Sequence, residues 1–270
     1  MTKTLLPDAR RGRVLVRRPG PHLARGLLTH LERRPVDADL ALAQWHAYVA
    51  AFQEHGWPTI EVDPADDCPD ATFVEDTMVV FGDLAVIARP GAPERRPETD
   101  GAELAVASLG YRIARITAPG TLDGGDVLKL GSTMYVGSGQ RTNVEGIRQL
   151  ADIVAPEGVE VVAVPISQVL HLKSAVTALP DGTLLAYLPG LDRPDLLPEL
   201  TPVPERHGWR AILLGGDKLL MSTSAPRTAQ LIADRGFEPV QVDVSELEKL
   251  EASVTCLSVR LREPLTAPSR

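Results

Sequence analysis

The sequence of 270 residues predicts an α/β fold, namely a five-bladed α/β propeller of strand–strand–helix–strand repeats with pseudo-five-fold symmetry. Three observations predict this fold. Pairs of apolar runs separated by a glycine-containing turn recur along the chain, as in β-hairpins. Helix-like segments and single apolar runs alternate with these pairs. Five such units would take roughly 54 residues each, near the period of propeller repeats. We therefore expect short helices on the outside and strands around a central channel that holds the active site.

The first two units have the same order of elements. The first has a hairpin, a helix and a strand at residues 73–89, 97–109 and 111–116. The second has the same elements at residues 127–136, 143–153 and 159–164. The two hairpins are expected to turn at Gly82-Asp83 and near Gly131-Ser132. We expect Asn143 to cap the second helix, because its side chain can accept a hydrogen bond from a free amide of the first turn.

The third unit has a hairpin at residues 175–188, a short helical segment and a strand at residues 209–214. The fourth has a strand, a helix and a strand at residues 218–222, 226–235 and 239–242. The fifth joins the chain ends, with strands at residues 255–260, 13–17 and 59–62 and an amphipathic helix at residues 37–55. Gly236 and Gly56 are expected to stop the helices that precede them. A fifth unit made from the N-terminal and C-terminal segments would close the ring of five repeats.

The composition is that of a globular protein and disfavours several classes of partner. A net charge of −8 makes binding to nucleic acid or to an anionic membrane unexpected. The N-terminus has no signal-peptide pattern, and no apolar run reaches the ~18 residues of a transmembrane helix. A chain with 2 cysteines and 270 residues needs neither disulfides nor structural zinc. We expect one catalytic domain over residues 1–270, located in the cytoplasm.

The first candidate site is an acidic cluster at the start of the first hairpin. Asp70, Glu75 and Asp76 lie close together in the sequence, with apolar residues between them. Carboxylates in this arrangement can hold a guanidinium group through charge-assisted bidentate hydrogen bonds. On a strand, Glu75 and Asp76 would face opposite sides. The alternative interpretation is a solvated strand end.

Two further candidates lie around the second hairpin. Asp123 is followed by two glycines and Asp126, so the backbone can approach a ligand closely. Asp123 could contact that ligand or orient a histidine. Arg141 precedes a helix and could bind a carboxylate group of a substrate. An ordinary turn and a surface arginine are the alternatives. The glycines do not form the fingerprint of a dinucleotide site.

His171 and Cys256 are the candidates for nucleophilic chemistry. His171 is expected at a turn that opens a strand, where an imidazole can act as general acid and base, although a lone histidine is more often structural. Cys256 is expected at the start of the C-terminal strand, exposed at the channel mouth; a buried cysteine would be inert. The two residues are far apart in the sequence but would be close in a ring. Cys68 is a poorer candidate, because neighbouring aspartates disfavour its thiolate.

Six short strings stand in a fixed order between about residues 14 and 261. They are PDATFVEDTMVV, IARPGAPERRPE, TLDGGDVL, GQRTN, LHLKS and SELEKLEASVTCLSV. Together they resemble the dimethylarginine dimethylaminohydrolase family of the guanidino-group-modifying (pentein) superfamily. The family fold is the same five-bladed propeller. The resemblance implies a cysteine hydrolase that converts asymmetric dimethylarginine or monomethylarginine to citrulline and a methylamine, with no cofactor and no metal. It is compatible with a homodimer.

The resemblance also implies a role for each reacting residue. Cys256 would be the nucleophile that attacks the guanidinium carbon, which gives a covalent thiouronium. His171 would protonate the leaving amine and then activate water, and Asp123 would orient His171. We expect the bound cation to lower the pKa of Cys256, as a nearby positive charge should. Adventitious zinc on Cys256 and His171 would inhibit.

The substrate would be held by three groups of residues. These are an acidic wall (Asp70, Glu75, Asp76 and Asp123), a carboxylate site (Arg95 and Arg141) and backbone groups for the α-amino end (Leu28 and Leu250). Leu28 would belong to a lid over residues 18–29. Some family members have glutamate at the position of Asp123 and aspartate at that of Glu251. The first difference keeps the charge but shortens the reach of the carboxylate in this chain, and the second affects the contacts near Leu250.

Several other functions share part of this pattern. Arginine deiminase performs the same chemistry on unmethylated arginine, but that family has an aspartate two residues after the histidine, where this chain has Lys173. Amidinotransferases, arginine dihydrolases and related amidine hydrolases are further alternatives. A non-catalytic propeller that only binds a cationic amino acid would need the acids and Arg141, but not Cys256 together with His171.

Overall fold

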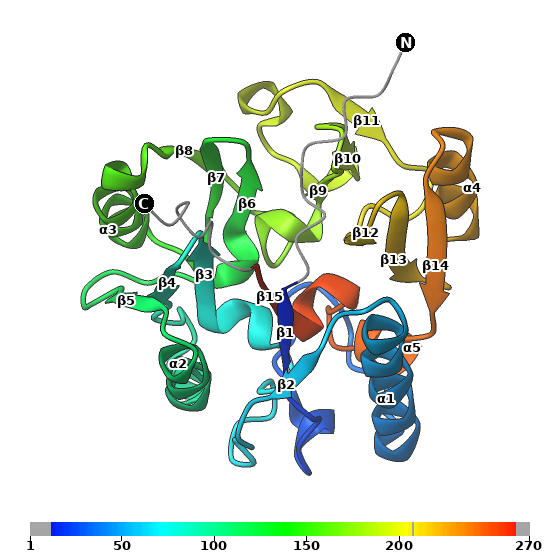
Figure 1. The fold of residues 1–270 in the computed structure, drawn as a ribbon, viewed down its shortest axis with the longest axis horizontal. Helices are drawn as coiled ribbons and strands as arrows, with labels where there is room; N and C mark the ends of the chain where they lie inside the picture. The colour runs from blue at the N-terminus through cyan, green and yellow to red at the C-terminus, as the bar shows by residue number, and fades with distance from the viewer. Residues whose placement is uncertain (1–11, 207, 263–270) are drawn as a thin grey trace, which may run out of the picture.

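Five three-stranded β-sheets surround a common centre in the computed structural model, which describes residues 12–206 and 208–262 (Figure 1). In every sheet the middle strand pairs antiparallel with one neighbour and parallel with the other. The longer helices lie at the periphery (Figure 1). The predicted five-bladed α/β propeller is therefore confirmed. In the described part of the chain, no helix has the length and apolar composition needed to cross a membrane.

The first two sheets follow the predicted order. The first contains β3 (Met78–Phe81), β4 (Leu84–Ile87), α2 (Glu98–Ser108) and β5 (Arg112–Arg115). The second contains β6 (Val127–Leu130), β7 (Thr133–Ser138), α3 (Val144–Val154) and β8 (Glu160–Pro165). The side chain of Asn143 accepts a hydrogen bond of 2.8 Å from the Gly146 amide, so the predicted cap of α3 is confirmed. Gly82 and Gly131 have positive φ at the two hairpin turns, a conformation that glycine adopts without strain.

The fifth sheet joins both ends of the described chain. It contains β15 (Ser258–Leu261), β1 (Arg13–Val16), α1 (Ala38–Glu54) and β2 (Thr59–Glu61). Asp37 caps α1 by accepting a hydrogen bond of 3.0 Å from the Leu40 amide. The buried face of α1 packs against α5 (Ser245–Glu248), which precedes the C-terminal part of the site. The predicted pairing of the N-terminal and C-terminal strands is confirmed, because β1 pairs antiparallel with β15.

The third and fourth sheets correct one prediction. The third contains β9 (Val176–Ala178), β10 (Leu184–Ala186) and β11 (Leu200–Pro202), and the fourth contains β12 (Ala211–Gly215), β13 (Lys218–Ser222), α4 (Pro226–Asp234) and β14 (Glu238–Val242). Placing a strand at residues 209–214 in the third unit was wrong, because β12 pairs antiparallel with β13. The third sheet ends instead with β11, which pairs parallel with β10. Its three residues stand among prolines, so the apolar pattern is too short to predict a strand.

Short 3-10 turns precede four of the inner strands. They are η2 (Val74–Thr77), η4 (Gly124–Asp126), η6 (Leu172–Ser174) and η9 (Val254–Leu257). The predictions that Glu75 and Asp76 face opposite sides of a strand, and that His171 and Cys256 open strands, were therefore wrong. Asp76 and Cys256 each donate the backbone amide to the carbonyl three residues earlier, as a 3-10 turn requires. Polar side chains on these turns therefore lie at the starts of the inner strands, near the centre of the propeller.

A cavity of about 480 Å³ runs along the inner strands of the five sheets. Residues of β3, β6, β9, β12 and β15 line it, as the predicted central channel requires. Glu75 and Lys173 also line this cavity. On the outer side of η9, Tyr48 of α1 is buried; its hydroxyl donates a hydrogen bond of 2.7 Å to the carbonyl of Val254, and its oxygen lies 2.7 Å from Ser258 Oγ. The turn that carries Cys256 is thus fixed from the helix side.

Candidate active site

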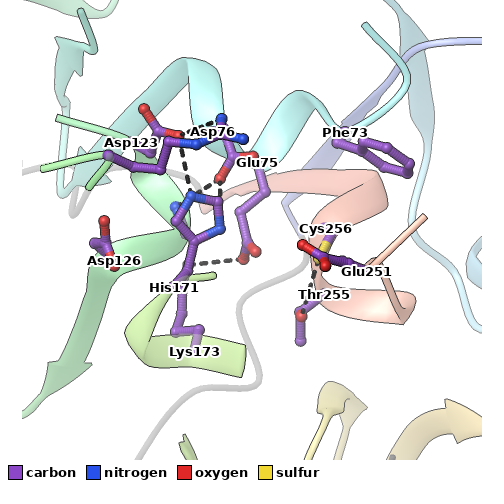
Figure 2. Close-up of polar contacts among 12 residues, drawn as sticks. Phe73, Glu75, Asp76, Asp123, Asp126, His171, Lys173, Glu251, Thr255 and Cys256 are labelled. Atoms are coloured by element: carbon purple, nitrogen blue, oxygen red, sulfur yellow. Dashed lines mark hydrogen bonds and ion pairs between the residues drawn. The ribbon is translucent and has the colours of Figure 1, made fainter. Parts of the chain in front are cut away.

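The 3-10 turns bring together side chains that are remote in the sequence. Turn η2 packs against both η4 and η9, and η4 packs against η6. Figure 2 shows the side chains of Asp76, Asp123 and His171 grouped together, with Cys256 on the other side of the view and Glu75 between them. The residues predicted from the first, second, third and fifth units therefore converge on one region.

His171 is held between two buried carboxylates. Its Nε2 lies 3.0 Å from Asp123 Oδ2, and its Nδ1 lies 3.7 Å from Asp76 Oδ1. Only 4% of His171 is exposed, and burial alone would lower its pKa. The carboxylates of Asp76, Asp126 and Asp123 outweigh burial and raise the pKa of His171 to about 9. The ring is therefore a stable imidazolium at neutral pH, ready to donate a proton.

Asp126 supports His171 through the backbone, a role that the sequence analysis did not assign. Asp126 Oδ1 accepts a hydrogen bond of 3.0 Å from the amide of Leu172, and Oδ2 accepts one of 2.6 Å from Thr142 Oγ1. Thr142 Oγ1 also accepts a hydrogen bond of 3.1 Å from the Asp123 amide. Burial raises the pKa of Asp126 to about 7, against the opposing influence of His171. The acid directly after Gly124-Gly125 was the available signal.

Asp76 and Glu75 are both engaged with cations. Asp76 Oδ2 accepts a hydrogen bond of 2.7 Å from Arg95 Nη1, and Oδ1 accepts one of 2.9 Å from the Gly125 amide. Burial opposes ionisation of Asp76, but His171 and Arg95 hold its pKa well below the usual range. Glu75 Oε1 lies 2.7 Å from Lys173 Nζ. Burial raises the pKa of Glu75, although Lys173 opposes this effect.

The two arginines predicted to bind a carboxylate differ in their surroundings. Arg95 is buried and donates to Asp76, to both oxygens of Glu98 and to two backbone carbonyls. It could bind a substrate carboxylate only by giving up one of these partners. Arg141 is 8% exposed, and its Nη1 makes no hydrogen bond within the described residues. That atom lies 3.6 Å from Asp123 Oδ2, so Arg141 keeps a buried, unused donor beside the site.

Two carboxylates fasten the segment that contains Leu28. Asp70 accepts hydrogen bonds of 3.0 and 3.2 Å from the amide of Leu27. Glu251 Oε1 accepts hydrogen bonds from three successive amides (Thr29, His30 and Leu31). Leu28 is partly buried against the apolar cluster that contains Leu250. The predicted lid is thus fastened on both sides of Leu28, and Glu251 is a further residue that the sequence analysis did not assign.

Cys256 lies on η9 and is partly exposed, so it is neither on the open surface nor sealed in the core. Burial is the largest influence that raises the pKa of its thiol, and Glu75 and Asp76 add to it. Arg210 opposes them. Cys256 is therefore a thiol at neutral pH in the unliganded protein. Cys68 is buried, and its pKa is raised chiefly by burial and then by Glu98, more than by the neighbouring aspartates invoked from the sequence.

Asp76, Asp123 and His171 each offer one atom to a group in which all atoms lie within 4.8 Å of one another. Such a group resembles a metal site, but Arg95 and Arg141 already place positive charge beside its two carboxylates. This charge disfavours a divalent cation. Cys256 does not belong to the group, and inhibition by zinc at Cys256 and His171 stays a prediction.

Residues 61–187 match the family model described as arginine deiminase. A relative from Streptomyces coelicolor, named N(G),N(G)-dimethylarginine dimethylaminohydrolase, is 62% identical over 93% of this chain and 97% of its own length. A relative of the same name from Pseudomonas aeruginosa is 34% identical over 92% of this chain and 98% of its own length.

Solved structures agree with these sequence relatives. The Pseudomonas aeruginosa enzyme in complex with citrulline has a TM-score of 0.86 and 32% identity, and it covers 93% of this chain and 100% of its own. A dimethylarginine dimethylaminohydrolase adduct with S-methyl-L-thiocitrulline has a TM-score of 0.85 and 32% identity over the same shares. A cyanobacterial arginine dihydrolase domain is 21% identical with a TM-score of 0.84, over 94% of this chain and 99% of its own, which indicates a shared fold alone.

Proposed function

This chain belongs to the dimethylarginine dimethylaminohydrolase family, and from this premise we propose that it converts asymmetric dimethylarginine and monomethylarginine to citrulline. The other product is dimethylamine or methylamine. The observation that carries the proposal is the imidazolium of His171 between Asp76 and Asp123, with Cys256 on turn η9, which packs against the turn η2 that contains Asp76. The proposal treats residues 1–270 as one catalytic domain in the cytoplasm, and a homodimer stays a prediction.

The first half of the reaction forms a bond to sulfur. Cys256 loses its proton when the substrate cation binds, and its thiolate attacks the central guanidinium carbon. His171 donates a proton to the methylated nitrogen, so the carbon–nitrogen bond breaks and the neutral amine leaves. The product of this half is a covalent thiouronium on Cys256. The raised pKa of His171 supports this step, because the acid must be protonated before the amine departs.

The second half breaks the bond to sulfur. Neutral His171 removes a proton from water, and the resulting hydroxide attacks the thiouronium carbon. The carbon–sulfur bond breaks and Cys256 leaves as a thiolate. The added hydroxyl group then releases its proton to solvent, which leaves the neutral ureido group of citrulline. Asp123 keeps the ring orientation constant through both halves, because its carboxylate lies 3.0 Å from Nε2. Proton donation and water activation then take place at one imidazole.

Three groups of side chains would hold the substrate. Asp76 and Asp123 would bind the guanidinium, with Asp70 and Glu75 completing the acidic wall. Arg141 would bind the α-carboxylate, which is supported by its buried and unused Nη1 donor. Arg95 would assist it after exchanging one present partner. Backbone groups of Leu28 and Leu250 would hold the α-amino end under the fastened lid. Each of these assignments follows from motif positions in the family.

Lys173 favours a methylated substrate over arginine itself. Its ammonium takes one Glu75 oxygen at 2.7 Å, which leaves fewer acceptors for a guanidinium with a full set of N–H donors. A methylated nitrogen has fewer N–H donors and therefore needs fewer hydrogen-bond acceptors from the protein. Arginine deiminase activity is the second candidate, since the matching family model carries that description.

The deciding experiment measures citrulline release from arginine, monomethylarginine, asymmetric dimethylarginine and agmatine. We expect turnover of the two methylated arginines and none in Cys256→Ser. Preference for plain arginine would favour the deiminase alternative. Saturable binding of the same compounds without citrulline would favour a non-catalytic binding protein.

A further inference from the structure

Trp209 and Arg210 connect the two turns that carry the proposed catalytic pair. They directly precede β12, at the place where the other four inner strands are preceded by η2, η4, η6 and η9. Trp209 Nε1 donates a hydrogen bond of 3.2 Å to the carbonyl of Lys173 on η6. Arg210 Nη1 donates one of 2.6 Å to the carbonyl of Ala252, in the loop just before η9. The fourth sheet therefore contributes to the site through this dipeptide, which the sequence analysis did not single out.

Among residues 12–206 and 208–262, the buried positive charge of Arg210 has no carboxylate partner. Arg210 is 5% exposed, and its Nη groups donate to the neutral carbonyls of Ala252 and Glu251. Its Nε makes no hydrogen bond, and Arg210 takes part in none of the ion pairs among the described residues. The carboxylate of Glu251 is directed instead to the lid amides. The Arg210 guanidinium also lies over the Trp209 ring, 5.2 Å from its centroid. Because a guanidinium stays protonated in proteins and this one has no carboxylate partner in the part of the chain that the structure describes, its charge is available to a nearby ionisable group.

The ionisable group on this side is the thiol of Cys256, which lies on η9, directly after the loop that Arg210 holds and packed against β12. Turn η9 packs against η2, β12 and β13, and Tyr48 of α1 holds its start. From η2, Glu75 and Asp76 present negative charge to the sulfur, and Tyr48 is buried and un-ionised because burial raises its pKa well above the usual range. On the side of β12, the positively charged group that acts on this thiol is the guanidinium of Arg210. A thiolate on Cys256 would therefore have two carboxylates on one side and this guanidinium on another.

We propose that Arg210 is a positioning residue that makes Cys256 nucleophilic, by holding the loop before η9 and by supplying the positive charge that stabilises the thiolate. The proposal rests on the proposed function in one respect, since it takes Cys256 as the nucleophile. In agreement with the geometry, Arg210 is the strongest of the influences that lower the pKa of Cys256. Lysine could supply the charge but not both carbonyl contacts, because only a guanidinium presents a planar fork of donors.

The test measures the rate of Cys256 alkylation by iodoacetamide as a function of pH, with mass spectrometry separating Cys256 from Cys68. In Arg210→Gln we expect the apparent thiol pKa to rise by about one unit. At a pH below both pKa values, alkylation should then be roughly tenfold slower. Arg210→Lys should recover at least half of that shift. Arg148→Gln, which removes an exposed arginine on α3, should leave the thiol unchanged.

An unchanged thiol pKa in Arg210→Gln would overturn the proposal, even if turnover falls, because a purely structural role would slow catalysis without moving this titration. If circular dichroism shows that Arg210→Gln does not fold, Arg210→Lys decides. A wild-type thiol pKa in Arg210→Lys supports stabilisation of the thiolate by the positive charge at this position. A rise of the thiol pKa by a full unit contradicts it. Alkylation needs no turnover, so this outcome is independent of the proposed function, which fails separately if Cys256→Ser still releases citrulline.

Discussion

His171 Nε2 lies 3.0 Å from Asp123 Oδ2 while His171 Nδ1 faces Asp76 Oδ1 at 3.7 Å, so both ring nitrogens meet buried carboxylates. This arrangement makes the imidazolium the resting form, with a pKa of about 9. In the unfolded chain the same group titrates near 6.5. The proposed general acid therefore also contributes to stability, because its extra proton is bound only in the folded state.

The first prediction concerns stability against pH. A histidine with a raised folded pKa contributes stability that is fully present below about pH 6.5 and is lost as the pH rises through about 9. The loss should be at most about 3 kcal/mol. Urea unfolding at pH values across this window should show a steeper decline for the wild type than for His171→Ala. Parallel declines would mean that His171 is neutral in the folded protein.

The second prediction concerns the thiol and the substrate charge. Burial, Glu75 and Asp76 raise the pKa of Cys256 in the unliganded protein. A bound guanidinium cation should lower it, because a positive charge favours the thiolate. Ultraviolet thiolate absorbance, titrated with and without an unreactive guanidinium ligand and corrected with Cys256→Ser, measures the shift. The same thiol pKa in both titrations would rule out substrate-assisted ionisation.

The third prediction concerns the pair between Glu75 and Lys173. Its side chains are mostly buried, so Lys173→Met leaves Glu75 without its cation. Removing one partner of a buried pair typically costs about 3–5 kcal/mol, and partial exposure places the expected loss at the lower end. Lys218→Met, which breaks the exposed pair with Glu238, is the matched control and should cost less than about 1 kcal/mol. Equal losses in chemical denaturation would contradict the structural account of this pair.

The fourth prediction concerns the lid. Glu251→Gln replaces a carboxylate that accepts three successive amides with a neutral amide oxygen. Hydrogen bonds to charged groups contribute about 1.5–3 kcal/mol, so we expect a KM increase of roughly tenfold or more with a smaller change in kcat. Hydrogen exchange of residues 27–31 should become faster. Glu238→Gln is the control, and a fall in kcat alone would show that Glu251 serves the chemistry and not the lid.

The sequence predicted the elements that have local signals. Helices α1 and α3 begin at Asp37 and Asn143 because each side chain caps the next turn, and the hairpins turn at glycines with positive φ. These signals act over a few residues, so a single sequence contains them. The recurrence of such elements was enough to predict the propeller.

The sequence could not predict what depends on distant contacts. Glu75 and Cys256 lie on 3-10 turns, and His171 directly precedes one. These turns are too short to have a hydrophobic period, so the sequence predicts strand ends there instead. Glu251 fastens amides about 220 residues away in the chain. Arg210 has no motif around it, and its role depends on a loop more than 40 residues later. Such residues can be assigned only when the fold has brought the segments together.

The most direct test of the account is intact-protein mass spectrometry of enzyme quenched in acid during turnover of asymmetric dimethylarginine. We expect an added mass equal to the substrate minus dimethylamine, located by digestion on the peptide that contains Cys256. We expect turnover by His171→Ala to be slower by about 10²–10⁴-fold, which should change how much of the adduct accumulates. Cys256→Ser should form no adduct. Citrulline formation by Cys256→Ser, or an adduct on any other residue, would contradict the central claim that this sulfur forms the covalent intermediate.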